Sequence, residues 1–228
     1  MANILYLDIE AIPSQQPGIL DEFAAEVKAP ATYKKADSIA AWMAENRQAE
    51  AEAAWLKTSF DGGMGQIVCI GWAVNDDAPQ HMVVADLSLA QERSMLRDWY
   101  GVLHGLHSTS GQRPLIVGHN HIAFDLPFLW KRSIVHSTRP PMWFPRDPKP
   151  WGEAVFDTML QWAGARDRIS MDKLCRVLGI AGKGDGPTGA DVWPMVQAGR
   201  LAEVAAYCCD DVARTRSIYK RLTFAEAA

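Results

Sequence analysis

Residues 4–10 read Ile4-Leu5-Tyr6-Leu7-Asp8-Ile9-Glu10, a run of apolar, strand-forming residues that delivers two carboxylates at its end. Side chains at positions i and i+2 of a strand point to the same face, and at about 3.3 Å per residue they lie roughly 6 to 7 Å apart. Two carboxylates placed in this way repel each other unless a cation, a proton or solvent separates them. The pair therefore predicts a shared divalent cation. The alternative, for the pair taken alone, is that both side chains are solvated in a turn after an edge strand.

The length and composition are those of an ordinary folded protein. The chain has 228 residues, of which 48% are hydrophobic and 22% charged, so it is long enough to bury a sizeable core. We expect one domain over residues 1–228, with a helical insertion at about residues 21–60. No stretch approaches the roughly eighteen apolar residues of a membrane span, and the N-terminus lacks the basic start and apolar core of a secretion signal. We therefore expect a cytoplasmic protein that makes no membrane contact.

The net charge and the cysteine spacing argue against two further classes of protein: those that coat nucleic acid, and those held together by zinc or disulfides. A net charge of −4 argues against a protein that coats nucleic acid by electrostatics alone, but leaves room for one that grips a short end through metals and a local basic patch. The cysteines show no C-x-x-C spacing, so we expect reduced, partly buried thiols rather than zinc ligands or disulfides. They are Cys69, Cys175, Cys208 and Cys209.

The pattern along the chain predicts an α/β fold. Residues 21–60 have helical spacing with a thin apolar stripe, and we expect this arm to cover one side of the core, with a substrate flap as the alternative. Residues 66–74 and 81–85 read as a hairpin. A helix at 87–106 leads to a strand at 114–118, and a strand reached through a helix is usually parallel to its neighbour. Later helices are expected from residue 126, from Asp157 as an N-cap, from residue 171, and over 192–198 and 201–222.

A second candidate group lies where the strand at 114–118 meets the next helix. Asn120 and Asp125 belong to this connection, and loops of this kind open at the carboxyl edge of a sheet, where Asp8 and Glu10 are also expected. Two local alternatives stay open. Asp125 before Leu-Pro is a good helix N-cap, and Asn120 is suited to closing a turn.

The last predicted helix carries a third group. Tyr207 and Asp211 are four residues apart and share one face, whereas Asp210 points well away from them. The local alternative makes Tyr207 a half-buried core residue and Asp211 an exposed charge. The joint pattern favours a shared site over these local alternatives, because the three groups occur in order on a strand, a loop-to-helix turn and a terminal helix.

Taken together, these motifs resemble the DEDD superfamily of 3′-to-5′ exonucleases on the ribonuclease H-like fold. The resemblance is to the tyrosine-bearing branch (DEDDy), because the histidine-bearing branch would place its histidine where this chain has Ala206. It is closest to stand-alone predicted exonucleases related to the proofreading domain of family B DNA polymerases, and it covers nearly the whole chain. The motifs that carry it are Asp8-x-Glu10, Asn120-x-x-x-Phe124-Asp125 and Tyr207-x-x-x-Asp211.

The resemblance implies a mixed β-sheet, antiparallel in its first strands and then parallel, flanked by helices. It also implies phosphodiester hydrolysis with two Mg²⁺ or Mn²⁺ ions, held by Asp8, Glu10, Asp125 and Asp211. Tyr207 completes the catalytic set. Because a phenol with a pKa of about 10 is a poor base at neutral pH, we expect it to orient the attacking water.

The sequence identifies the residues that contact the substrate less directly than it identifies the metal ligands. By resemblance Asn120 and Phe124 are substrate-binding, with Phe124 beside the terminal base; core packing is the alternative for Phe124. Lys183 lies in a glycine-rich loop and is expected either to reach a phosphate or to be solvated. Residues 130–151 interleave cations with aromatic residues, as single-strand binding grooves do, or else pack a proline-rich loop onto the core.

The predicted function is metal-dependent hydrolysis from the 3′ end of single-stranded nucleic acid, with DNA as the first choice and an RNA-directed exoribonuclease as an alternative. A replication or repair partner would act in trans, and the sequence makes no prediction of oligomeric state. A second class is a binding module on the same fold that no longer cuts; such a module would normally have lost a ligand. A phosphatase with Asp8 as nucleophile is a third class, which Glu10 fits poorly.

Overall fold

Strand β1 (Ile4–Ile12) is the centre of the computed structural model, which describes residues 3–225. It is the middle strand of a five-stranded sheet with the order β3-β2-β1-β4-β5. The pairing is antiparallel from β1 to β2 and from β2 to β3, and parallel from β1 to β4 and from β4 to β5. The predicted mixed sheet is confirmed, and β5 is an addition that the sequence pattern did not predict. The flanking strands are β2 (Gln66–Val74), β3 (Gln80–Val83), β4 (Leu115–Gly118) and β5 (Val155–Asp157).

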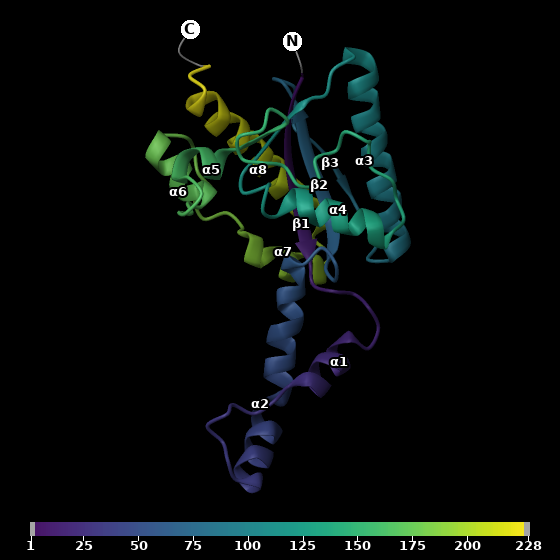
Figure 1. Cartoon of the computed structure of the whole chain (residues 1–228), viewed down its shortest axis with the longest axis vertical. Coiled ribbons are helices and arrows are strands. Elements are labelled where there is room, and N and C mark those ends of the chain that lie inside the picture. Colours follow the sequence, from purple (N-terminus) through teal and green to yellow (C-terminus); the bar gives the residue numbers. More distant parts are fainter. Residues whose placement is uncertain (1–2, 226–228) are drawn as a thin grey trace.

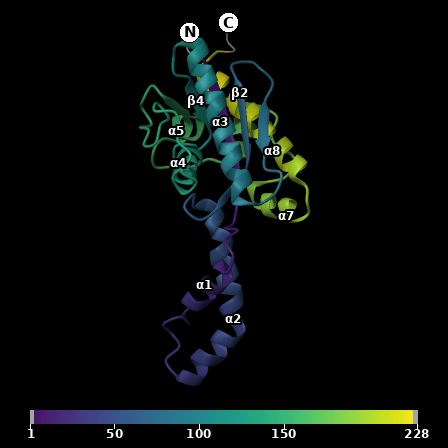
Figure 2. The same cartoon turned by 90° about the vertical axis from the view of Figure 1, so that its right-hand side faces the viewer.

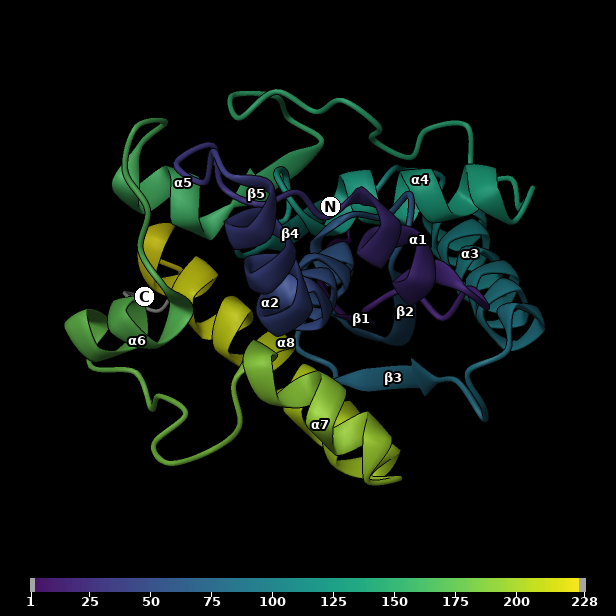
Figure 3. The same cartoon turned by 90° about the horizontal axis from the view of Figure 1, so that it is seen from below.

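The two faces of the sheet are covered by different helices (Figure 3). Leu5, Leu7 and Ile9 of β1 belong to a core that includes buried side chains of α3 (Leu89–Ser110) and α4 (Asp125–Val135). On the other face, Tyr6 packs in a cluster with residues of α8 (Leu201–Leu222). Because Asp8 and Glu10 alternate with Ile9, they face the α8 side.

Short helices follow β5 and pack around α8. Three of them contact α8 directly, namely α5, α6 and α7. The short helices after β5 are α5 (Thr158–Ala163), α6 (Met171–Leu178), η2 (Gly189–Asp191) and α7 (Val192–Gln197).

None of the helices within residues 3–225 is long and apolar enough to cross a membrane.

The insertion forms an arm that points away from the sheet (Figures 1 and 2). It consists of α1 (Ile19–Glu26), α2 (Ala36–Leu56) and the 3-10 turn η1 (Lys57–Phe60), with no helix between residues 26 and 36. The expectation that it covers one side of the core is therefore wrong. The physical reason is composition: most apolar residues of α2 are alanines, only Ala51 is buried, and the helix packs on α1 instead.

A buried ion cluster joins α3, α4 and β2. The carboxylate of Glu92 accepts hydrogen bonds from Arg132 Nε at 2.8 Å and Nη2 at 2.5 Å, from His136 Nε2 at 2.7 Å, and from the Ile67 backbone N–H at 2.8 Å. Burial opposes ionisation of Glu92, but the hydrogen bonds from His136 and Arg132 outweigh it and hold the pKa below its usual value. Arg132 and His136 are thus structural, and the interpretation of residues 130–151 as a binding groove does not hold for them.

Arg132→Met should destabilise the protein strongly, because it leaves the buried Glu92 carboxylate without its bidentate partner. We expect a loss of about 3–5 kcal/mol in the free energy of unfolding, measured by urea denaturation. Arg97→Met is the matched control, since Arg97 pairs with Asp98 at the surface and should change the free energy by less than about 1 kcal/mol. Equal effects of the two substitutions would contradict the structural role of the cluster.

Candidate active site

The carboxylates of β1 form the floor of the site. Glu10 is buried and Asp8 is half-buried. In the register of β1 with β2, Asp8 lies opposite Gly71, and the sheet has an irregularity directly after Glu10. Oxygen atoms of both carboxylates and Sγ of Cys208 lie within 4.8 Å of one another. The same-face arrangement predicted from the Asp-x-Glu spacing is therefore present.

Asp125 is tied to β1 rather than capping its own helix. Its Oδ1 accepts the backbone N–H of Ile9, the residue between the two β1 carboxylates, at 3.0 Å. The N-cap of α4 is Phe124, and no side chain caps this helix. The alternative that Asp125 is an N-cap is therefore wrong, and its carboxylate is directed to the first motif.

Asp157 holds the loop that leads to Asp125. It caps α5 as predicted, accepting from the N–H groups of Met159 and Leu160, and it also accepts from the N–H groups of Asn120 and Ile122 at 3.0 and 3.1 Å. The second role was not predicted, because it depends on β5 lying beside β4. Asp157 therefore connects the second motif to the edge of the sheet.

Asn120 closes the turn in this loop. It adopts a left-handed backbone conformation with φ of 62°, which asparagine tolerates better than most residues. Its carbonyl accepts from the N–H groups of Ala123 and Phe124. Within residues 3–225 its side-chain Oδ1 is buried without a hydrogen-bond partner. The turn-closing alternative is thus present, and the amide oxygen still has its acceptor capacity.

The third motif lies on the inner face of α8. Tyr207 and Asp211 are both buried, whereas Asp210 is exposed, so the alternative that Asp211 is a surface charge is wrong. Lys183 Nζ donates to Tyr207 Oη at 2.5 Å and to Asp211 Oδ2 at 2.8 Å. Arg214 donates to Asp211 Oδ1 at 2.8 Å. Lys183 is therefore not simply solvated; it joins the glycine-rich loop to the third motif.

Electrostatics couple the three groups. Burial raises the pKa of the Asp8 carboxyl well above its usual value, and the charges of Asp125 and Asp211 raise it further. Burial also raises the pKa of Glu10, to which Asp8 and Asp211 add, and it raises the pKa of Asp125 to about 7. The site thus concentrates negative charge that its own cations only partly balance.

Tyr207 is kept in its protonated form. Burial raises the pKa of its hydroxyl far above the usual value, and the neighbouring charges of Glu10 and Asp211 act in the same direction. At neutral pH the phenol therefore remains a hydrogen-bond donor. This agrees with a role in orienting a water molecule and disagrees with one as a base.

Cys208 is a contributor that sequence reasoning missed. Its Sγ lies 3.4 Å from Asp8 Oδ2 and 3.5 Å from the Asp8 carbonyl oxygen. A Cβ atom at Gly71 would meet this sulfur at 2.7 Å, so glycine allows α8 to approach β2 this closely. Burial raises the pKa of the Cys208 thiol well above its usual value, so it donates to Asp8 as a thiol. The available signal was the position of Cys208 beside Tyr207.

The donor set fits a hard divalent cation. Asp8, Glu10, Asp125 and Asp211 offer only oxygen atoms, which Mg²⁺ and Mn²⁺ prefer over sulfur. The two cations on Asp211 leave lone pairs on its oxygens for a further partner. Cys208 is not expected to be a ligand, because its protonated thiol already donates to Asp8. The residues present therefore suit the predicted ions.

Two aromatic residues of the predicted substrate-binding segments pack against other aromatic residues of the protein. Phe124 is half-buried, with its ring centroid 5.4 Å from that of Phe128. Within the segment 130–151, Phe144 packs in the core against Trp99 and Tyr100, so the packing alternative holds for this part of the segment.

The stability of the metal-free protein should fall with rising pH through Asp125. Its folded pKa of about 7 exceeds the unfolded value of about 4, so its stabilising contribution is complete below about pH 4 and is lost as the pH rises through 7. Asp125→Asn retains an acceptor for the Ile9 N–H and should gain stability relative to wild type between pH 5 and 8 in thermal melts with chelator. Asp210→Asn is the exposed control; a constant difference between wild type and Asp125→Asn would contradict the burial argument.

Comparisons with known proteins give the family. A family model described as a predicted 3′-5′ exonuclease related to the exonuclease domain of PolB matches residues 55–228; β1 lies before this range. The family B DNA polymerase of the hyperthermophilic archaeon Pyrobaculum calidifontis has a similar fold, with a TM-score of 0.60 and 15% identity over 98% of this chain. The chain spans 25% of that polymerase, and no curated protein matches it. The matched range is most of the chain, which therefore belongs to the family of predicted 3′-5′ exonucleases related to the exonuclease domain of PolB.

Proposed function

We propose that this protein is a metal-dependent 3′-5′ exonuclease that removes nucleotides from single-stranded nucleic acid, with DNA as the substrate. The observation that carries the proposal is the convergence of carboxylates from β1, α4 and α8 around Asp8. Asp125 binds the β1 backbone at Ile9, and the charge of Asp211 acts on both Asp8 and Glu10. The structural acid Glu92 is neutralised by Arg132 and His136, whereas Asp8, Glu10 and Asp125 share a site in which Lys183 and Arg214 pair with Asp211.

Asp8, Glu10, Asp125 and Asp211 would hold two Mg²⁺ or Mn²⁺ ions. Such ions lower the pKa of a bound water and stabilise both the attacking and the leaving oxygen of an in-line displacement. The charges of Asp125 and Asp211 act on Asp8, and the charge of Asp8 acts on Glu10, so Asp8 would be a ligand in common with the other carboxylates. The Asp125 side chain is fixed by the Ile9 N–H, so it is already oriented toward β1.

The remaining residues would position the reacting groups. Tyr207, protonated and held by Lys183, orients the attacking water. Lys183 places a positive charge among the carboxylates, which reduces the repulsion that a phosphate meets. Phe124 offers a ring beside the terminal base, and Asn120 offers its amide oxygen.

The nucleotide-release assay described next also distinguishes two alternative functions. A binding module that does not cut would bind single strands without releasing nucleotides. An exoribonuclease would cut RNA faster than DNA of the same sequence.

Asp8→Ala and Asp211→Ala should each abolish nucleotide release. With Mg²⁺ or Mn²⁺, wild type should shorten a 5′-labelled single strand stepwise from its 3′ end, and chelation or a blocked 3′ end should stop it. Removing one ligand of a shared metal pair should lower the rate by about 1,000-fold or more. Asp210→Ala, one residue from Asp211 but exposed, should retain activity. Release that survives chelation would refute the proposal.

Tyr207→Phe should separate water positioning from metal binding. It removes the hydroxyl that Lys183 holds, and we expect turnover to fall about 10- to 100-fold. The rise in melting temperature on adding Mn²⁺ should stay close to that of wild type, because no carboxylate has changed. A variant that loses the melting-temperature response together with activity would instead indicate that Tyr207 supports the fold of the site.

A further inference from the structure

The 3-10 turn η1 is fixed to the strand that carries the first motif. Thr58 Oγ1 accepts the backbone N–H of Ser14 at 2.8 Å, just after the end of β1. Trp55, two residues before the turn, donates its indole N–H to the Ser14 carbonyl at 2.8 Å. The base of the arm is therefore anchored a few residues beyond Asp8 and Glu10.

On its other side, the segment that follows η1 packs on α4. A Cβ atom at Gly62 would meet the Phe128 Cα at 2.7 Å, so glycine is needed for this close approach. Lys131 Nζ forms an ion pair with Asp61 Oδ1 at 2.7 Å. As a result η1 is held between β1 and α4, the two elements that carry Asp8, Glu10 and Asp125.

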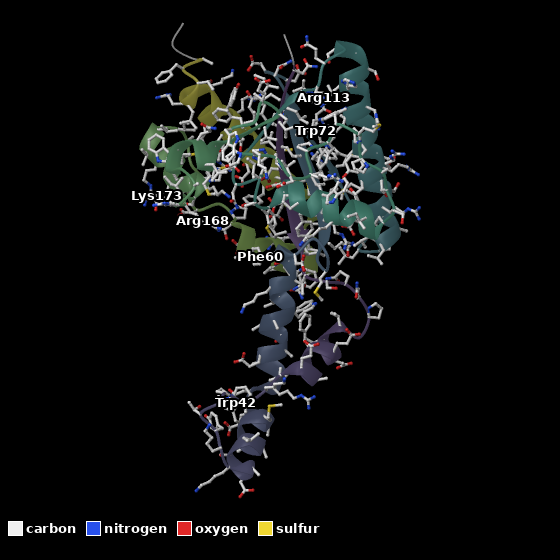
Figure 4. The ribbon with its side chains drawn as sticks, viewed as in Figure 1. Trp42, Phe60, Trp72, Arg113, Arg168 and Lys173 are labelled. Atoms are coloured by element: carbon white, nitrogen blue, oxygen red, sulfur yellow. The ribbon has the colours of Figure 1, made fainter. Side chains whose placement is uncertain are left out.

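Phe60 ends this turn with its ring largely in solvent. It is 74% exposed, and its ring centroid lies 6.4 Å from that of Phe124, the residue directly before Asp125. Figure 4 shows Phe60 at the junction of the arm and the sheet. An exposed aromatic ring held beside Phe124, the neighbour of Asp125 in the chain, is a surface on which a flat, apolar group can stack.

Lys57 lies on the same side of the turn. In a 3-10 helix the side chains at i and i+3 are eclipsed, so Lys57 and Phe60 project together from η1. Lys57 is exposed, and no ion pair or hydrogen bond of its ammonium group is present among residues 3–225. A cation and an aromatic ring side by side match the phosphate and the base of one nucleotide.

We propose that Lys57 and Phe60 form a binding subsite for the unpaired strand that enters the active site. Phe60 stacks on a base upstream of the 3′-terminal one, which is next to Phe124, and Lys57 pairs with a backbone phosphate. This inference rests on the proposed exonuclease function and names the contact by which the base of the arm recognises the substrate. The cation and the ring act locally, which agrees with a chain whose net charge is −4.

The test compares Phe60→Ala and Lys57→Ala with matched controls at the end of the sheet that lies away from the arm. Phe224 is an 80% exposed aromatic residue after α8, and Arg113 is an exposed cation before β4, labelled far from Phe60 in Figure 4. Steady-state kinetics are measured on an oligothymidylate about 15 nucleotides long. We expect Phe60→Ala to raise KM about 5- to 20-fold and Lys57→Ala about 3- to 10-fold, with smaller changes in kcat. Phe60→Trp should restore KM, while Phe224→Ala and Arg113→Ala stay within about twofold of wild type.

Two further measurements separate this subsite from the chemistry. Hydrolysis of p-nitrophenyl thymidine 5′-phosphate, which has one base and no upstream strand, should be unchanged in Phe60→Ala. Binding of a fluorescein-labelled oligothymidylate with Ca²⁺ is followed by anisotropy, so that the subsite is tested even if wild type releases no nucleotides. Weaker binding by Phe60→Ala without any cutting by wild type would support the subsite and refute the nuclease. KM and dissociation constants equal to those of Phe224→Ala would overturn the subsite while leaving the nuclease intact.

Discussion

The structure depends on holding like charges together on its central strand. Asp8 and Glu10 share one face of β1, and Asp125 and Asp211 are brought beside them, which costs free energy in proportion to their burial. The protein offsets part of this cost with the Cys208 thiol on Asp8, the Ile9 N–H on Asp125, and Lys183 with Arg214 on Asp211. These donors come from α8, β1 and the glycine-rich loop, so the positions of β1, α4, α8 and that loop are linked through the charges they share.

The contrast with Glu92 separates structural acids from the acids of the site. Glu92 is fully buried, yet its pKa lies below the usual value because Arg132, His136 and a backbone N–H satisfy both oxygens. Asp157 behaves in the same way: burial opposes its ionisation, but the neighbouring His121 side chain and four backbone N–H groups hold its pKa below the usual value. Asp8, Glu10 and Asp125 are shifted in the opposite direction. The same residue types are thus neutralised where they support the fold and left short of positive charge where the motifs meet.

The sequence pattern predicted most of the helices and strands but few of the tertiary contacts between them. Alternation along residues 4–10 and helical spacing over 201–222 are local, so β1 and the inner face of α8 could be predicted from them. β5 has three residues, too few for a periodic signal, and Lys183 meets Tyr207 only because distant segments pack together. Asp125 satisfies the local rules for an N-cap, but its hydrogen bond to Ile9 spans 116 residues, and tertiary contacts of this kind leave no local mark.

The contacts at the base of the arm also join segments that are distant in the sequence, and they bear on substrate recognition. Its direction depends on the contacts at its base, where Trp55 bonds to Ser14 and packs edge-to-face on Trp193 of α7 with centroids 5.7 Å apart. These contacts fix η1 relative to β1 on one side and to α4 on the other, through Gly62 and Asp61. An exposed ring on a mobile loop would lose much of its stacking energy to ordering the loop on binding. A ring on a turn anchored at both ends has already lost that freedom on folding, so the base of the arm is placed to contribute to recognition even though α1 and α2 lie away from the sheet.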